Sequence, residues 1–160
     1  MRFASRMGVA TVLVAASVGL AAAAPSAAAP SAEVSGDLVP TSATFHPGQV
    51  GDNLVLGFDG THAWSGSFTG TSSIVGDLVV RPSGPATFRG IVTFTGNTPC
   101  GPATVRLITT GSGDLPFLSG RAVTIGANDA SESVHAQLDV SLVLLPTGAF
   151  VHYTGDVHCG

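Results

Sequence analysis

Residues 64–96 read WSGSFTGTSSIVGDLVVRPSGPATFRGIVTFTG. An aromatic residue followed by Thr-Gly occurs twice in this stretch, at residues 68–70 and 94–96, and once more at residues 153–155. Aromatic and β-branched residues that alternate with Gly, Ser and Thr between turn residues are typical of neighbouring antiparallel strands. The sequence therefore predicts an all-β domain.

Segments of the same alternating kind run through the rest of the chain, and turn-like residues separate them. We expect strands over residues 33–45, 53–58, 62–71, 72–81, 86–96, 103–110, 121–126, 134–145 and 149–159. The first is expected to break at Pro40, because proline belongs to strand edges. Residues rich in Gly, Pro, Asn and Asp predict turns at 46–48, 59–60, 82–85, 97–102, 111–114 and 146–148, and a polar loop at 128–133.

Eight or nine short strands joined by turns predict an antiparallel up-and-down β-barrel of about eight strands, with a β-sandwich as the alternative. Glycines inside the strands favour the barrel, because strongly coiled strands bend and cross closely there. These glycines are Gly57, Gly66, Gly90 and Gly155. Apolar side chains occupy every second position of residues 134–142, which predicts one buried and one exposed face.

The first 32 residues are expected to lie outside this domain. Arg2 and Arg6 precede an apolar run at residues 7–24, and an Ala/Pro/Ser tract follows. This order is typical of a helical secretory signal peptide, with an uncleaved membrane anchor as the alternative. With cleavage between about residues 26 and 32, residues 33–160 would form a single β-barrel domain of a secreted, extracellular protein. No later apolar run is long enough to cross a membrane as a helix.

The two cysteines, Cys100 and Cys159, both follow the signal peptide. An even number of cysteines in an oxidising compartment predicts a disulfide between them rather than two free thiols. Neither cysteine has a second Cys or His at the spacing of metal ligands, so we expect no metal site.

The charge of residues 33–160 is sparse and acidic. The chain has no lysine, and this part carries four arginines against ten acids, a net charge of −6. Nucleic-acid binding requires a basic stripe that neutralises phosphates, so a nucleic-acid partner is not expected. Binding to anionic lipid surfaces is disfavoured for the same reason.

The sequence carries no recognisable catalytic set. It has no Gly-x-Ser-x-Gly nucleophile motif, and its only glutamates are Glu33 and Glu132. No glycine-rich phosphate loop precedes a helix, because no helix is expected after the signal peptide. We therefore favour a protein without enzymatic activity and without a cofactor.

The five histidines, at positions 46, 62, 135, 152 and 158, are expected to have structural roles. His152 and His158 share a strand face, but six residues of strand separate them by about 20 Å. His135 is expected beside His152 as an outward polar pair of a hairpin. His46 and His62 flank predicted turns and are expected in solvent.

The arginines of the predicted sheet, Arg89 and Arg106, are expected at the surface or at the barrel mouth. Partial burial of either one, paired with Asp59 or Asp139, would indicate a site for an acid group.

Four aromatic residues are the candidate ligand-binding residues: Trp64, Phe68, Phe94 and Tyr153. They belong to the repeated motif, and their strand positions turn them toward the expected interior. There they either fill the core or form the wall of an apolar pocket, and both readings stay open because an eight-stranded barrel can be filled by its own side chains.

Five motifs follow one another in a characteristic order. They are Ser-Gly-Ser-Phe-Thr-Gly-Thr at 65–71, Phe-Arg-Gly-Ile-Val-Thr-Phe-Thr-Gly at 88–96, Cys-Gly at 100–101, Gly-Ser-Gly-Asp-Leu-Pro-Phe-Leu-Ser-Gly-Arg-Ala at 111–122 and Tyr-Thr-Gly-Asp-Val-His-Cys at 153–159. This order resembles secreted bacterial allene oxide cyclase-like (calycin-type) β-barrel proteins over residues 53–159. Ala122 departs from that pattern, which has a glycine there. The resemblance implies a barrel and carries no catalytic residue across.

Three functions follow as hypotheses. The favoured one is a non-enzymatic secreted barrel that binds a small apolar ligand or acts at the cell surface. The second, implied by the resemblance alone, is an isomerase or cyclase acting on an apolar substrate inside the barrel. The third is a structural or surface-interaction module, which would expose an apolar patch.

Overall fold

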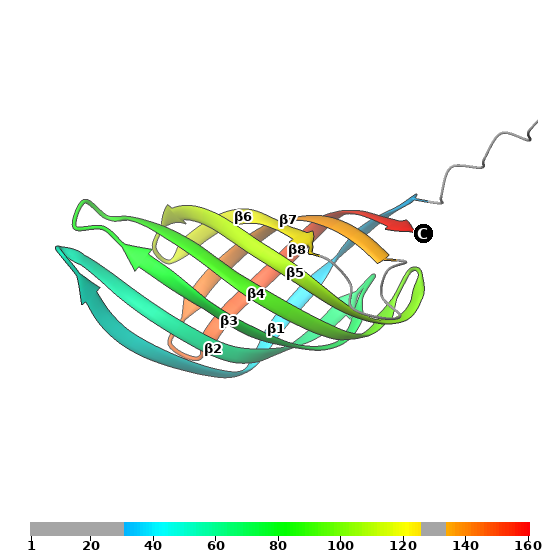
Figure 1. The fold of residues 1–160 in the computed structure, drawn as a ribbon, viewed down its shortest axis with the longest axis horizontal. Coiled ribbons are helices and arrows are strands. Elements are labelled where there is room, and N and C mark those ends of the chain that lie inside the picture. Colours follow the sequence, from blue (N-terminus) through cyan, green and yellow to red (C-terminus); the bar gives the residue numbers. More distant parts are fainter. Residues whose placement is uncertain (1–30, 126–133) are drawn as a thin grey trace, which may run out of the picture.

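The computed structural model describes residues 31–125 and 134–160, and it is a closed barrel of eight antiparallel strands. Each strand pairs with the next one in the chain, and β8 pairs with β1 to close the barrel (Figure 1). The strands are β1 (Ser31–Val50), β2 (Asn53–Gly66), β3 (Thr69–Val80), β4 (Pro85–Thr98), β5 (Gly101–Asp114), β6 (Phe117–Thr124), β7 (Val134–Leu145) and β8 (Gly148–Cys159). The predicted all-β, up-and-down barrel is confirmed, and the sandwich alternative is wrong.

The predicted signal peptide and the predicted polar loop at 128–133 fall outside the described residues. Within 31–125 and 134–160 there is no helix of the length and apolarity needed to cross a membrane.

Two predicted turns, at residues 46–48 and 59–60, are wrong because both segments lie inside paired strands. Asp59 pairs with Thr44 of β1 and with Val75 of β3. The chain reverses instead at residues 51–52, where Gly51 has a φ of +59°. A Cβ atom at Gly60 would lie 2.6 Å from the Ser42 carbonyl oxygen, so this glycine permits close strand contact and does not form a turn.

The predicted strand over 62–71 is divided by the β2–β3 connection. β2 ends at Gly66, whose φ is +95°, and β3 begins at Thr69. Phe68 therefore lies in a connection and not within a strand. The expected break at Pro40 is a register shift between Pro40 and Ser42, a bulge that bends β1 without ending it.

The predicted turn at 97–102 is too long, and the predicted turn at 111–114 is wrong because all of its residues lie in β5. β4 continues to Thr98 and β5 runs from Gly101 to Asp114, so the two real turns comprise residues 99–100 and 115–116. The predictions for 82–85, 134–145 and 149–159 agree with the observed elements to within about one residue.

The core lies on the inside of the barrel. The buried apolar side chains alternate with exposed polar ones along each strand, and this is clearest in β7. There the buried positions are Val134, Ala136, Leu138 and Val140, as predicted.

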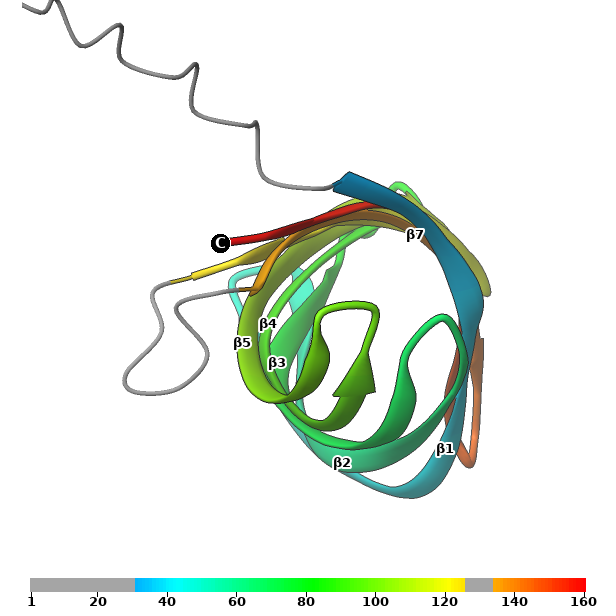
Figure 2. The same ribbon diagram turned by 90° about the vertical axis from the view of Figure 1, so that its right-hand side faces the viewer.

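A disulfide joins Cys100 and Cys159, whose Cα atoms are 5.4 Å apart, and this confirms the predicted bridge. It links the β4–β5 turn to the end of β8, two segments that do not pair in the sheet. Figure 2 views the barrel from this side and shows the β2–β3 and β4–β5 connections within its outline. We call this side the disulfide end.

Candidate functional site: an apolar cavity in the barrel

An apolar cavity of about 100 Å³ lies inside the barrel, and residues of all eight strands line it. Most of its wall consists of apolar side chains, and the buried ones include Leu78, Phe88, Val92, Leu107, Leu138 and Val140. A mostly apolar hollow with few polar groups is the usual form of a small-molecule site.

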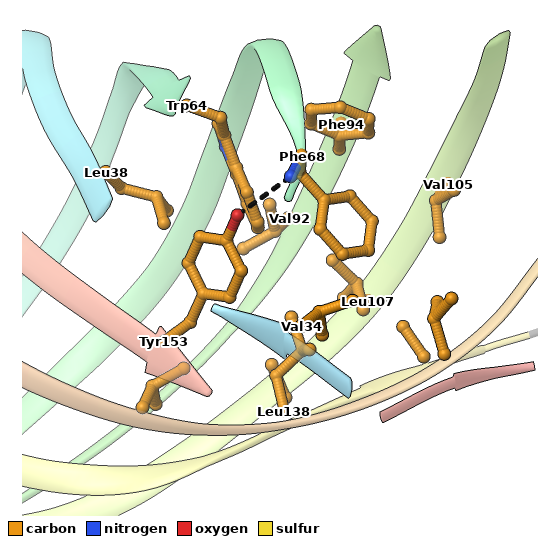
Figure 3. Close-up of a cluster of buried hydrophobic side chains, with 14 of the residues drawn as sticks. Val34, Leu38, Trp64, Phe68, Val92, Phe94, Val105, Leu107, Leu138 and Tyr153 are labelled. Carbon is orange, nitrogen blue, oxygen red and sulfur yellow. Dashed lines mark hydrogen bonds between the residues drawn. The ribbon is translucent and has the colours of Figure 1, made fainter. Parts of the chain in front are cut away.

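The four candidate ligand-binding residues form one aromatic cluster at the disulfide end of the cavity (Figure 3). Their ring centroids are 5.0 Å apart for Trp64 and Phe94 and 5.8 Å apart for Phe68 and Tyr153. Tilted and edge-on rings at such distances stabilise one another beyond the burial of their area. Trp64 and Tyr153 line the cavity, and Phe68 and Phe94 do not.

The polar atoms of this cluster form hydrogen bonds with other groups of the protein. The Tyr153 hydroxyl accepts a hydrogen bond of 2.9 Å from the Phe68 backbone N–H and donates one of 3.1 Å to the Ser65 carbonyl. Burial raises the pKa of Tyr153, and the bond from Phe68 opposes part of that rise. The Trp64 Nε1–H donates to Ser72 Oγ at 2.8 Å. The cluster thus closes the disulfide end as a plug with satisfied polar groups.

Gly36 of β1 makes room for the Tyr153 side chain. The two residues are paired in the β1–β8 ladder. A Cβ atom at Gly36 would collide with the Tyr153 hydroxyl and the Ser65 carbonyl. The sequence analysis missed this glycine, because a single Gly in a strand does not reveal which side chain crosses over it.

The opposite part of the cavity is bounded by the part of β1 and β8 that no ladder joins. Their ladder ends where Leu38 pairs with Val151, and beyond it β1 pairs only with β2. We call residues 39–45 of β1 and 148–150 of β8 the β1–β8 seam. The more exposed lining residues include Ser42, Ala43, Phe45 and Ala149, all of which belong to it.

His62 is the residue that the sequence analysis placed wrongly. It was expected in solvent beside a turn at 59–60, but β2 continues through that point and turns His62 to the same face as Trp64. Its side chain lines the cavity and the residue is 6% exposed. His62 lies two residues before Trp64, so in a continuous strand both side chains point to the same face. The turn predicted at 59–60 hid this relationship.

The ring of His62 lacks one hydrogen bond. Nδ1 is buried and has no partner among the described residues. Burial lowers the pKa of His62, and a backbone hydrogen bond to Ala149 raises it in part. The neutral imidazole is therefore the favoured form in the folded protein.

The other histidines lie outside the barrel. The expected pair of His135 with His152 is wrong, because His135 pairs with His158 in the β7–β8 ladder and His152 pairs with Ser141. His152 Nδ1 lies 2.8 Å from Asp37 Oδ1, and His46 Nε2 lies 2.7 Å from Asp59 Oδ1. Across 31–125 and 134–160, no three His, Cys, Asp or Glu side chains come together as a metal site would require.

Arg89 and Arg121 form exposed pairs with carboxylates, and no arginine lines the cavity. Arg89 lies 3.5 Å from Asp77, where Asp59 had been considered, and Arg121 is the residue 3.3 Å from Asp139. Arg106 is exposed on β5. Exposed pairs of this kind contribute about 1 kcal/mol at most.

No protein-family model matches the chain, and no curated protein is significantly similar to it. The cavity and its lining residues are therefore the evidence for function.

Proposed function

We propose that this protein is a secreted, non-enzymatic binding protein that holds a small apolar molecule inside its barrel. The observation that supports this function is the apolar cavity of about 100 Å³ between the aromatic plug and the β1–β8 seam. Transfer of apolar surface from water into such a wall is favourable by about 25 cal/mol per Å². An apolar cavity of this kind stays dry and accepts apolar molecules.

Export to an oxidising compartment is supported by the Cys100–Cys159 disulfide and by the basic and apolar start of the chain. β1 begins at Ser31, so cleavage at or before residue 30 would leave the β1–β8 ladder whole. Mass spectrometry of the exported protein tests this point.

Trp64 provides a direct test of ligand binding, because it is the only tryptophan of the chain and lines the cavity. Titration with short alkanes and their ethers should shift its fluorescence in a saturable way. Ala122 is buried in the cavity wall, so Ala122→Leu and Ala122→Phe should weaken binding in that order. Ile108→Phe, on the exposed face of β5, is the matched control. Unchanged emission at saturating ligand would refute the function.

A cyclase or isomerase acting in the same cavity is the second candidate. The resemblance over residues 53–159 suggests it, and buried His62 is an ionisable side chain that a proton transfer would use. Tyr153 and Asp59 line the cavity too. The Tyr153 hydroxyl is bonded to the backbone of Phe68 and Ser65, however, and the Asp59 carboxylate is bonded to His46 outside the barrel. Binding is favoured because acid–base chemistry would need a second group. NMR of the recovered ligand distinguishes the two, since only an enzyme would change its structure.

A surface-interaction module is the third candidate, and a row of exposed apolar residues favours it. Val75, Ile91, Ile108 and Val123 are cross-strand neighbours on the outer face of β3 to β6. They are 65%, 41%, 43% and 38% exposed. Sedimentation of the wild type and of Ile91→Ser tests whether this row mediates association.

A further inference from the structure

The surroundings of His62 leave one of its ring nitrogens without a hydrogen-bond partner. Its neighbours across the sheet are Pro40 of β1 and Ser72 of β3. Pro40 has no N–H, and the Ser72 hydroxyl is bonded to Trp64 Nε1. His62 Nδ1 is the single buried side-chain nitrogen or oxygen of the described residues that has no hydrogen bond.

A buried polar atom without a partner is unfavourable, and native proteins rarely retain one without a reason. Water is a poor explanation, because a buried water needs two to four polar partners and the wall here is almost entirely apolar. His62 lines the cavity, so a ligand there would lie against its ring, and a turn of the ring about its Cβ–Cγ bond would bring Nδ1 to a polar group of the ligand.

Which ring nitrogen of His62 carries the proton decides which polar group of a ligand can bond to Nδ1. A backbone contact with Ala149 opposes the lowering of the His62 pKa, and because Nδ1 has no partner, we assign the ring proton to Nε2, facing the Ala149 carbonyl. A neutral imidazole with a proton on Nε2 presents a lone pair at Nδ1. The missing partner is therefore a hydrogen-bond donor.

We propose that His62 Nδ1 accepts a hydrogen bond from the hydroxyl group of an otherwise apolar ligand, so that the cavity selects alcohols over ethers, alkanes and carboxylates. This inference rests on the proposed binding function and names its ligand class. Carboxylates are disfavoured because the cavity wall contains no arginine, the chain has no lysine, and a buried anion without a partner is costly. The position of His62 between Pro40 and Ala149 places the ligand hydroxyl beside the β1–β8 seam.

The test compares hexanol, hexyl methyl ether and hexanoate, which have the same alkyl chain and different polar ends. Binding is measured by Trp64 fluorescence and by calorimetry on the complete exported protein. We expect hexanol to bind about tenfold more tightly than the ether, the effect of one net hydrogen bond in a dry site. Hexanoate should bind most weakly.

Two variants test whether His62 causes the preference for hexanol over the ether. His62→Phe keeps a ring of similar size without a nitrogen, and it should bind the ether as the wild type does while losing the preference for hexanol. His158→Phe changes an exposed histidine at the disulfide end and should keep the full preference.

The role of His62 and the binding function are contradicted by different results. Equal binding of hexanol and ether by the wild type, or a preference that survives in His62→Phe, overturns the role of His62 but leaves a general apolar site. Failure of all the ligands to bind overturns both. If His62→Phe does not fold, ring-nitrogen NMR of the wild type decides, because hexanol and not the ether should move the His62 Nδ1 signal. A signal that does not respond to hexanol overturns the inference.

Discussion

The hydroxyl of Tyr153 in β8 accepts a hydrogen bond from the backbone N–H of Phe68, which lies 85 positions earlier in the chain. The same hydroxyl donates to the carbonyl of Ser65. One side chain thereby bonds to a backbone group at the end of β2 and to another in the β2–β3 connection, and it holds the Phe68 ring within the barrel. The floor of the cavity depends on this contact.

Tyr153→Phe should lower the free energy of unfolding by about 1–3 kcal/mol, because it removes the hydroxyl to which the buried Phe68 N–H and the Ser65 carbonyl are bonded. Denaturant unfolding measures the loss. Phe150→Leu changes an exposed aromatic residue of the same strand and should alter stability by about 0.5 kcal/mol or less. Equal stability of Tyr153→Phe and the wild type would show that the hydroxyl does not hold the connection.

Gly36→Ala should destabilise the barrel by about 1–3 kcal/mol, because the added methyl would displace Tyr153 or widen the β1–β2 pair. Gly48→Ala is the matched control on the same strand. At Gly48 a Cβ atom would meet its nearest neighbour, the Val55 carbonyl oxygen, at 3.6 Å, an ordinary contact. Thermal unfolding should therefore give a lower melting temperature for Gly36→Ala than for Gly48→Ala, although both add one methyl group. Similar melting temperatures would contradict the crowding at Gly36.

Stability should decrease as the pH falls below the ordinary His pKa of 6.5, and His62 should cause part of that decrease. Burial lowers the pKa of His62 in the folded state, so the unfolded chain binds its proton at a higher pH than the folded protein does. The stabilisation is complete above 6.5 and is lost as the pH falls through the folded-state pKa. The slope from one such group cannot exceed about 1.4 kcal/mol per pH unit.

His62→Phe should flatten the stability curve in this range, whereas His158→Phe, which changes an exposed ring, should not. Denaturant unfolding at a series of pH values gives both curves. Identical acid-side slopes for His62→Phe and the wild type would exclude a titrating group at this position.

Removal of the disulfide should lower the free energy of unfolding by about 4 kcal/mol, the loop-entropy value for cysteines separated by 59 residues. The double variant Cys100→Ser/Cys159→Ser is compared with the oxidised wild type by denaturant unfolding. The reduced wild type should resemble the double variant. A double variant as stable as the oxidised protein would mean that the plug and the ladders alone hold the disulfide end.

The strands that the sequence predicted well are those whose two faces differ in polarity. Residues 134–145 alternate strictly between apolar and polar side chains, so both the extent of β7 and its buried face could be predicted. The disulfide could also be predicted, since two cysteines in an exported chain leave one pairing.

Local turn chemistry misled the prediction where strand pairing overrides it. Asp59 and Gly60 are a strong hairpin signal in isolation, but ladders on both sides hold them in β2. His62 was misplaced as a direct result, and with it the buried ring nitrogen that has no hydrogen-bond partner among the described residues. The contact of Tyr153 with Phe68 could not be predicted either, because it depends on how far the barrel coils.

The pairing of Ser31 with His158 brings the first and last strands side by side at the disulfide end. Each strand neighbours its successor all the way round, so the order of the eight strands is a cycle with no preferred starting point. A short linker from the end of β8 to the start of β1 would join them, and new termini could be introduced at residues 82–84 in the β3–β4 turn without cutting a ladder. Such a circular permutant should keep the same fold.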